Sequence, residues 1–174
     1  PLTGLVLSGG GARAAYQVGV LRALVKMRRE VLGPRSRMAN PFGVISGTSA
    51  GAINASTLAC HADDFDGAVD GLVHLWQGLH VESIYRADAF EAVRSGARWL
   101  SMLSLGWALA RWTRSRPRSL LDNTPLRNLL SKYLDMSRIE AMLAGGHLHA
   151  VALAGSSYTS GQHVTFYQTH QAIE

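Results

Sequence analysis

The pattern of apolar residues divides the first 60 residues of the chain into alternating strands and helices. Short apolar runs predict strands over residues 4–8 and 42–46. Between these runs, apolar residues recur every three or four positions, which predicts a helix over residues 13–29. A second helix is predicted from about residue 50 to residue 60. The elements therefore follow the order βαβα.

The first predicted helix carries one apolar stripe. Val18, Leu21 and Val25 recur on the same face of the helix, with Leu24 beside them. An amphipathic helix buries its apolar face against the core of the domain. We therefore expect this stripe to cover one face of the sheet.

The rest of the chain predicts further helices and a closing pair of strands. Helical spacing of apolar residues continues over residues 64–79, 88–96 and 98–113. Residues 149–154 read as a buried strand, and residues 162–168 follow as a second strand. The turn between them is short, so we expect these two strands to form a hairpin.

Two more helix starts carry capping signals. Thr124 precedes Pro125. Proline is favoured in the first turn of a helix, because the backbone N–H that it lacks would have no partner within the helix there. Ser137 and Glu140 match the capping box, in which the two residues pair with each other's backbone N–H groups. The sequence predicts a helix after each signal.

The strand predicted over 42–46 leads into Gly47-Thr48-Ser49-Ala50-Gly51, which matches the G-x-S-x-G pattern of a nucleophile elbow. In this motif a serine occupies a tight turn between a strand and a helix, so that its Oγ projects into open space. The glycines on either side are needed because larger side chains would clash where strand and helix cross. Ser49 is therefore the candidate nucleophile. An ordinary strand-to-helix loop is the alternative interpretation.

The first predicted strand ends in a second candidate element, formed by Gly9, Gly10 and Gly11 and called here the glycine loop. Glycines after a strand let backbone N–H groups approach an anion, and the N-terminus of the next helix adds partial positive charge. In acyl transfer, such a loop holds the oxyanion of the tetrahedral intermediate. We predict this role for the glycine loop.

The glycine loop has two alternative interpretations. Gly9, Gly11 and Ala14 also fit the dinucleotide-binding pattern G-x-G-x-x-G/A. That pattern requires an acidic residue about 20 positions further on, at the end of the second strand. Glu30 has this spacing, but it lies in a charged stretch typical of a solvated helix end. The second alternative is a loop that only turns the chain.

The order of the two motifs argues against the α/β-hydrolase fold. Only one strand-helix unit fits between the glycine loop and Ser49, whereas α/β-hydrolases place several units before their elbow. The two linked motifs instead resemble those of the patatin-like phospholipases. The resemblance is densest over residues 5–60, and it extends to the segments 120–126 and 158–161.

The resemblance implies an α/β fold, a three-layer sandwich around a central, mostly parallel sheet, in one domain over residues 1–174. It implies a serine acyl hydrolase of lipid esters, of the phospholipase A or lysophospholipase type, with a Ser-Asp dyad and no catalytic histidine. Ser49 would be the nucleophile and Gly9 to Gly11 the oxyanion loop, with Arg13 as the basic residue of the family's loop motif. We expect neither a metal ion nor a cofactor.

The aspartate of this dyad has no good match in the chain. The family places it in an Asp-Gly-Gly or Asp-Gly-Ala motif well downstream of the serine. Asp66, followed by Gly67 and Ala68, has these letters but stands only 17 residues after Ser49, among apolar residues at helical spacing. We predict that Asp66 is a solvated helix residue. We also expect the chain to be the N-terminal part of a longer catalytic domain, with little or no activity alone.

The predicted mechanism begins with attack of Ser49 Oγ on an ester carbonyl, while the glycine loop holds the oxyanion. Water then releases the acyl group from the enzyme. A noncatalytic lipid-binding or regulatory module with the same fold is the alternative. The two differ in whether a downstream aspartate completes the dyad.

Composition adds few limits. The 174 residues, 47% of them hydrophobic, suffice for one core. Cys60 is the single cysteine, so the chain has no cluster of cysteine metal ligands. A single cysteine also favours a reducing, cytoplasmic location. We expect Cys60 to be a small residue packed in the core. The sequence begins without a signal-peptide pattern, and no apolar run reaches the roughly 18–20 residues of a membrane span.

Positive charge is concentrated in residues 94–118, which contain six arginines and no acidic residue. The apolar stretch 99–110 within this segment includes two tryptophans and suits an interfacial helix. Peripheral contact with anionic lipid and a core or lid helix are the two interpretations. The formal charge of +5 alone does not indicate nucleic acid, and no nucleic-acid-binding motif accompanies it. We therefore expect lipid and no nucleic acid as a partner.

Overall fold

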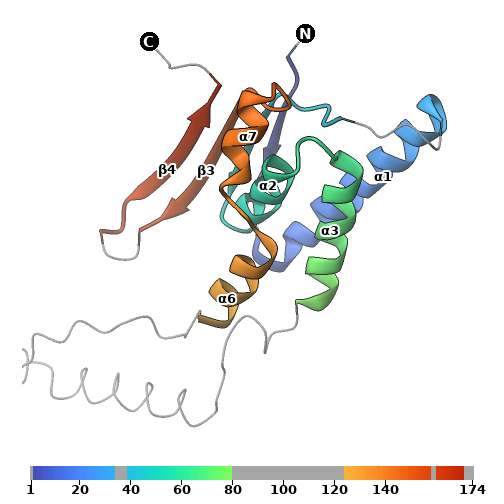
Figure 1. The fold of residues 1–174 in the computed structure, drawn as a ribbon. Coiled ribbons are helices and arrows are strands. Elements are labelled where there is room, and N and C mark those ends of the chain that lie inside the picture. The colour runs from blue at the N-terminus through green and yellow to red at the C-terminus, as the bar shows by residue number, and fades with distance from the viewer. Residues whose placement is uncertain (1, 34–38, 80–123, 158–159, 171–174) are drawn as a thin grey trace, which may run out of the picture. The chain divides into compact units, whose positions relative to one another are not determined.

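The computed structural model, drawn in Figure 1, describes residues 2–33, 39–79, 124–157 and 160–170. The chain divides into two units, each described here by itself. One unit comprises residues 1–78 and 133–174, and the other comprises residues 79–132. All the strands and most of the described helices belong to the first unit.

Several sequence predictions lie outside the described residues. They are the two predicted helices before residue 114 and the arginine-rich segment. Parts of the two segments that extend the family resemblance also lie outside. The ranges concerned are 88–96, 98–113, 94–118, 120–123 and 158–159.

The first unit is built on a four-stranded sheet in the order β1-β2-β3-β4. The strands are β1 (Gly4–Leu7), β2 (Val44–Thr48), β3 (Ala150–Ser156) and β4 (His163–Thr169). β1, β2 and β3 run parallel, and β4 pairs antiparallel with β3. The predicted C-terminal hairpin is therefore confirmed, and the fold is α/β with a mostly parallel sheet.

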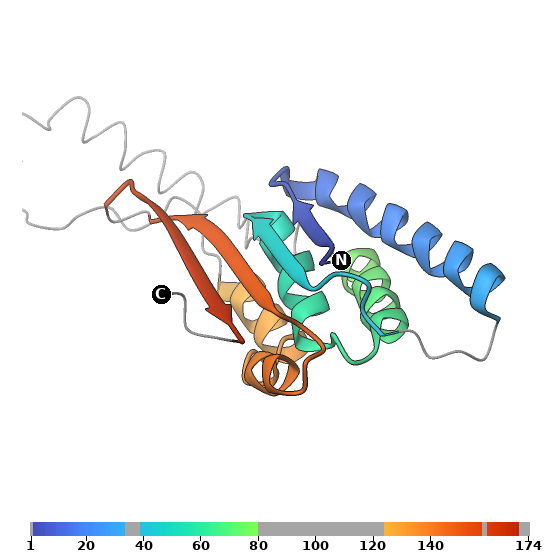
Figure 2. The same cartoon turned by 90° about the horizontal axis from the view of Figure 1, so that it is seen from above.

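The described α-helices all fall where the sequence predicts them, with ends that differ by a few residues. They are α1 (Ala14–Leu32), α2 (Ala50–Cys60), α3 (Phe65–Gly78), α6 (Thr124–Tyr133) and α7 (Arg138–Ala144). A short 3-10 turn, η1 (Gly11–Arg13), which the sequence did not predict, precedes α1. Figure 2 shows α2, α3 and α7 gathered on one side of the sheet.

Helix α2 lies at the centre of the first unit. It packs against β1, β2 and β3 on one side and against α1, α3 and α7 on the others. Seven consecutive residues, from Asn54 to Cys60, are buried, because neighbours surround the second half of the helix. Small residues such as Ala55 and Ala59, both 0% exposed, allow this close packing.

The apolar stripe of α1 is buried as predicted, but against a different partner. Val18, Leu21 and Val25 are each at most 5% exposed. Helix α1 packs mainly against α3 and less against α2 (Figure 2). The expectation that this stripe would cover the sheet is wrong, because α2 occupies that position.

The capping box predicted at Ser137 does not form. Helix α7 starts at Arg138, yet the Ser137 side chain makes no capping hydrogen bond. Instead, Ser137 Oγ donates to Asp135 Oδ1 at 2.5 Å, and the Ser137 backbone N–H donates to the same oxygen at 3.1 Å. These two hydrogen bonds lower the pKa of Asp135 below its ordinary value. A local turn built on Asp135 therefore replaces the box.

The face of the sheet opposite α2, called here the second face, is exposed to solvent at both edges. Val6, Ser46, Ala152 and Tyr167 are in register across the four strands, so their side chains share this face. Val6 is 81% exposed and Tyr167 is 67% exposed.

None of the helices in the described ranges has the length and apolar content needed to cross a bilayer.

Candidate active site

Ser49 lies in the turn between β2 and α2. Its backbone has φ 54° and ψ −122°, and it is the one non-glycine residue with positive φ among the described residues. Such a conformation costs on the order of 1–3 kcal/mol and persists only where the surroundings enforce it. Here the Ser49 N–H donates to the Ala154 carbonyl of β3 at 3.0 Å, and the Ser49 carbonyl accepts from the Ala52 N–H at 2.9 Å.

The side chain of Ser49 is exposed, and it makes no capping hydrogen bond to the start of α2. Thr48 before it is also exposed, while Ala50 after it is half-buried. The strained turn thus presents a serine hydroxyl to solvent at the N-terminus of a helix. A helix N-terminus favours negative charge that develops nearby.

The two glycines of the elbow permit the close approach of other backbone segments. A Cβ on Gly47 would lie 2.6 Å from Ala55 Cβ and 2.8 Å from Ala52 Cα, both on α2. A Cβ on Gly51 would lie 2.6 Å from the carbonyl oxygen of Ser8 and would also clash with that of Leu7. Any larger residue at either position would push the strand and helix apart.

The glycine loop lies directly beside Ser49. A Cβ on Gly9 would stand 3.2 Å from Ser49 Cβ and 3.2 Å from the carbonyl oxygen of Thr48. Gly9, Gly10 and Gly11 are all exposed, and Gly11 has a φ of 55° that favours glycine. The structure therefore brings together the two motifs that the sequence singled out.

A chain of hydrogen bonds from three helices ends on the residue before the glycine loop. Trp76 Nε1 of α3 donates to Asn54 Oδ1 of α2 at 2.7 Å. Asn54 Nδ2 donates to the Ala14 carbonyl at 3.1 Å and to Gln17 Oε1 at 3.0 Å, both on α1. Gln17 Nε2 then donates to the Ser8 carbonyl at 2.8 Å.

Sequence reasoning did not identify this chain of amides. One signal was available, because Asn54 is a polar residue in the otherwise apolar run Ala52 to Ala55. Asn54 is 0% exposed, and a buried amide requires hydrogen-bond partners. Its partners on α1 and α3 lie too far away in the sequence for local patterns to reveal them.

Comparison with known protein families identifies the family of the chain. The sequence profile described as Patatin-like phospholipase matches residues 5–168, nearly the whole chain. The chain belongs to the patatin-like phospholipase family. Searches of curated proteins and of solved structures gave no match. Family membership indicates a lipid acyl hydrolase.

In this patatin-like chain, Arg13 lies in the turn η1 that joins the glycine loop to α1. Its side chain is exposed, and its backbone N–H donates to the Gly10 carbonyl at 3.2 Å. Ala14 follows it and is only 1% exposed. The Ala14 carbonyl accepts the hydrogen bond from Asn54.

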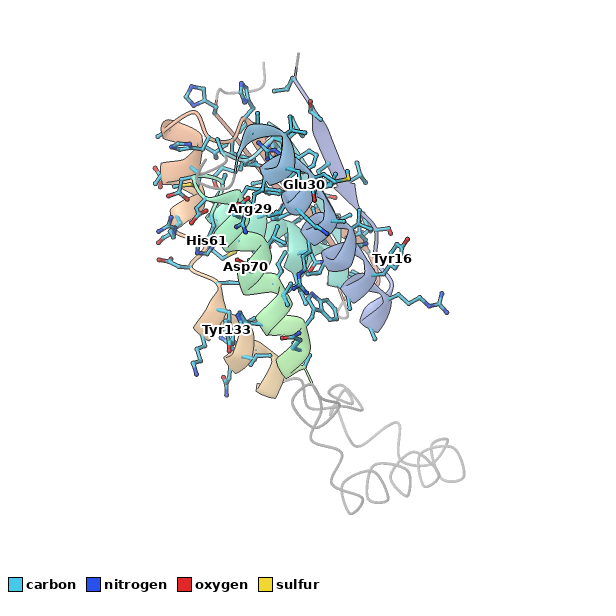
Figure 3. The ribbon with its side chains drawn as sticks, turned by 90° about the vertical axis from the view of Figure 1, so that its right-hand side faces the viewer. Tyr16, Arg29, Glu30, His61, Asp70 and Tyr133 are labelled. Atoms are coloured by element: carbon cyan, nitrogen blue, oxygen red, sulfur yellow. The ribbon has the colours of Figure 1, made fainter. Side chains whose placement is uncertain are left out.

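The prediction that Asp66 is a solvated residue is wrong. Asp66 is 8% exposed, and its Oδ2 accepts a hydrogen bond from Arg29 Nε at 2.6 Å. This contact raises the pKa of Arg29 above its ordinary value, and Asp70 adds to the effect. Figure 3 shows Arg29 and Asp70 where α1 faces α3. Asp66 is thus a structural partner of α1.

Asp66 also lies far from the patatin-like elbow. Its partner Arg29 follows Ala14 by 15 residues along α1. At 1.5 Å per residue, this separates the two positions by about 22 Å. Ala14 marks the end of α1 that contacts Asn54 and the glycine loop. Asp66 therefore cannot accept a proton from Ser49.

The position of Glu30 argues against the alternative of dinucleotide binding. Glu30 is exposed near the C-terminal end of α1 and not at the end of a strand (Figure 3). The second strand instead ends at Thr48, beside the elbow. The carboxylate that would hold a ribose is therefore missing from the position where that fold requires it.

Proposed function

We propose that this patatin-like chain carries the nucleophile and the oxyanion loop of a serine hydrolase that cleaves lipid acyl esters. The observation that carries the proposal is the contact between Gly9 and Ser49. A strained, exposed serine at a helix N-terminus, with a glycine-rich backbone against it, is the arrangement that acyl transfer requires.

The proposed reaction has two steps. Ser49 Oγ attacks the ester carbonyl and transfers its proton to a base, while N–H groups of the glycine loop stabilise the oxyanion. The tetrahedral intermediate collapses, expels the alcohol part of the lipid with that proton, and leaves an acyl-serine. Water then attacks the acyl-serine in the same way, which releases the fatty acid and restores Ser49.

We further propose that the base is an aspartate outside the described residues. The described carboxylates near α2 are engaged elsewhere. Asp63 pairs with Arg138, Asp64 accepts from the Gly67 N–H, and Asp66 pairs with Arg29. Among the described residues no carboxylate makes a hydrogen bond with Ser49. A Ser-Asp dyad fits the family and needs no histidine.

Release of fatty acid from a phospholipid tests this function in the full-length protein. Ser49→Ala should lower the rate by several orders of magnitude, because the nucleophile is lost. Ser46→Ala is the matched control, since Ser46 is a half-buried serine of β2 on the second face of the sheet. Ser46→Ala should retain the wild-type rate. Equal rates for Ser49→Ala and the wild type would remove Ser49 from the reaction.

Contact with anionic lipid through residues 94–118 is a separate part of the proposal. It is supported by the six arginines and three tryptophans of that segment. Sedimentation with anionic vesicles at low salt tests it, with wild type compared with a variant that neutralises four of the arginines. These are Arg111, Arg114, Arg116 and Arg118. Equal partitioning of the two proteins would contradict lipid binding by this segment.

A further inference from the structure

We propose that Gln17 and Asn54 are positioning residues that hold the glycine loop in the geometry needed for the oxyanion. The proposal rests on the proposed function, because the role has meaning only if the loop binds an oxyanion. Neither residue belongs to the nucleophile elbow or to the glycine loop. Both act through the carbonyl of Ser8, which immediately precedes Gly9.

Trp76 fixes the direction of every hydrogen bond in the series that leads through Asn54 and Gln17 to Ser8. An indole N–H can only donate, so Asn54 must present Oδ1 to Trp76. The Nδ2 of Asn54 then faces Ala14 and Gln17, and Gln17 must receive this bond on Oε1. The remaining amide nitrogen of Gln17 is therefore the atom that faces the Ser8 carbonyl. No other orientation of the two amides pairs all these groups.

Burial makes this arrangement rigid. Asn54 is 0% exposed, and it uses its oxygen and both hydrogens of Nδ2 in hydrogen bonds. Rotating its amide by half a turn would set Nδ2 against the indole N–H of Trp76. Each buried group left without a partner costs about 1–3 kcal/mol. The Asn54 amide is thus fixed, and it holds the Gln17 side chain where Gln17 can donate to the Ser8 carbonyl.

The Ser8 carbonyl matters because it belongs to the same peptide group as the Gly9 N–H. That peptide group is planar and trans, so fixing the carbonyl also fixes the N–H on the opposite side. Gln17 donates to the carbonyl at 2.8 Å, and Gly51 of α2 lies so close that a Cβ on it would come within 2.6 Å of the carbonyl oxygen. Gly9 then follows against Ser49.

The substitution Gln17→Met tests the positioning role. Methionine has a similar length but cannot donate to Ser8, and Asn54 keeps its hydrogen bond to Ala14. Gln17 is only half-buried, so the variant should fold. The first measurement is the rate at which a fluorophosphonate probe labels Ser49 in the full-length protein. We expect this rate to fall by roughly ten- to a hundredfold, less than the loss of a whole oxyanion donor.

The second measurement is the NMR order parameter of the backbone N–H groups of Gly9, Gly10 and Gly11, which reports motion directly. It should fall in Gln17→Met, while the indole N–H resonance of Trp76 stays in place. Thr57→Val is the matched control. Thr57 is buried in α2 like Asn54, but its Oγ1 donates to the Ile53 carbonyl within the helix. Thr57→Val should change neither the labelling rate nor the loop.

The two measurements separate this inference from the proposed function. A fall in both labelling and loop order supports the positioning role. A fall in only one of them, or in neither, overturns it. If the wild-type protein is not labelled at Ser49, the proposed function fails, and loop order alone then decides the structural part. Lower order in Gln17→Met would support that part, and unchanged order would contradict it.

Discussion

Gly9 and Ser49 are 40 residues apart in the sequence, yet a Cβ on Gly9 would stand 3.2 Å from the Cβ of Ser49. The parallel pairing of β1 with β2 creates this contact, because both motifs follow the carboxyl ends of neighbouring strands. In open α/β sheets, ligands bind beyond these strand ends. The contact therefore lies where the fold can hold a substrate.

The first prediction concerns Gly9→Ala. Its methyl group would meet Ser49 and the backbone of Thr48 at 3.2 Å, so the loop or the elbow must shift. We expect fluorophosphonate labelling of Ser49 to slow by at least about tenfold, because misplaced donors stabilise the oxyanion less. Gly19→Ala is the control, since a Cβ at Gly19 on the exposed side of α1 meets nothing within 4 Å. Equal labelling rates in the two variants would contradict the proposed role of the loop.

The second prediction concerns the stability of the elbow. Gly51→Ala places a methyl group 2.6 Å from the Ser8 carbonyl oxygen. Overpacking of this kind costs about 1–3 kcal/mol, so the urea midpoint of unfolding should fall. Gly71→Ala in α3 provides the comparison, because a Cβ there meets nothing within 4 Å. A wild-type midpoint for Gly51→Ala would show that the elbow tolerates a side chain at this position.

The third prediction separates Asp66 from the chemistry. Asp66→Asn removes the charge that pairs with Arg29, whose side chain is 45% exposed. We expect the free energy of unfolding to fall by about 1 kcal/mol, since partly exposed ion pairs contribute little more. Labelling of Ser49 should proceed at the wild-type rate. If labelling is lost while the variant remains folded, Asp66 belongs to the catalytic unit after all.

The fourth prediction concerns Cys60 and pH. Burial raises the pKa of the Cys60 thiol from 9.0 to about 11. The unfolded chain therefore releases this proton first, so stability that is present below pH 9 is lost as the pH rises toward 11. Denaturation midpoints at pH 8 and pH 10.5 should differ less in Cys60→Ala than in the wild type. Rapid reaction of Cys60 with a maleimide in the folded protein at pH 8 would contradict its burial.

Local patterns were sufficient to predict most of the described elements and both motifs. The pattern of apolar residues located β1, α1 and β2, because each of these elements buries one face or stripe, and α2 was predicted as the helix that follows the elbow. The elbow and the glycine loop were recognised because their glycines meet steric requirements that only glycine satisfies. Their role in catalysis stays a prediction.

Apart from the capping box at Ser137, which a local turn on Asp135 replaces, the errors concern partners that are distant in the sequence. The stripe of α1 packs mainly against α3, because the small residues of α2 let that helix take the place against the sheet. Asp66 is buried because Arg29 reaches it from α1, and charge alone had suggested solvent. The hydrogen bonds of Asn54 to Gln17 and Trp76 depend on the packing of three helices. Periodicity identifies the buried face of an element but not the element that covers it.

Covalent labelling shows directly whether Ser49 is the nucleophile. The full-length protein is treated with a fluorophosphonate probe and digested, and the modified peptide is identified by mass spectrometry. We expect a single modification on Ser49 that disappears in Ser49→Ala and persists in Ser46→Ala. Labelling that persists in Ser49→Ala, or a modification at another residue of the wild type, would contradict it.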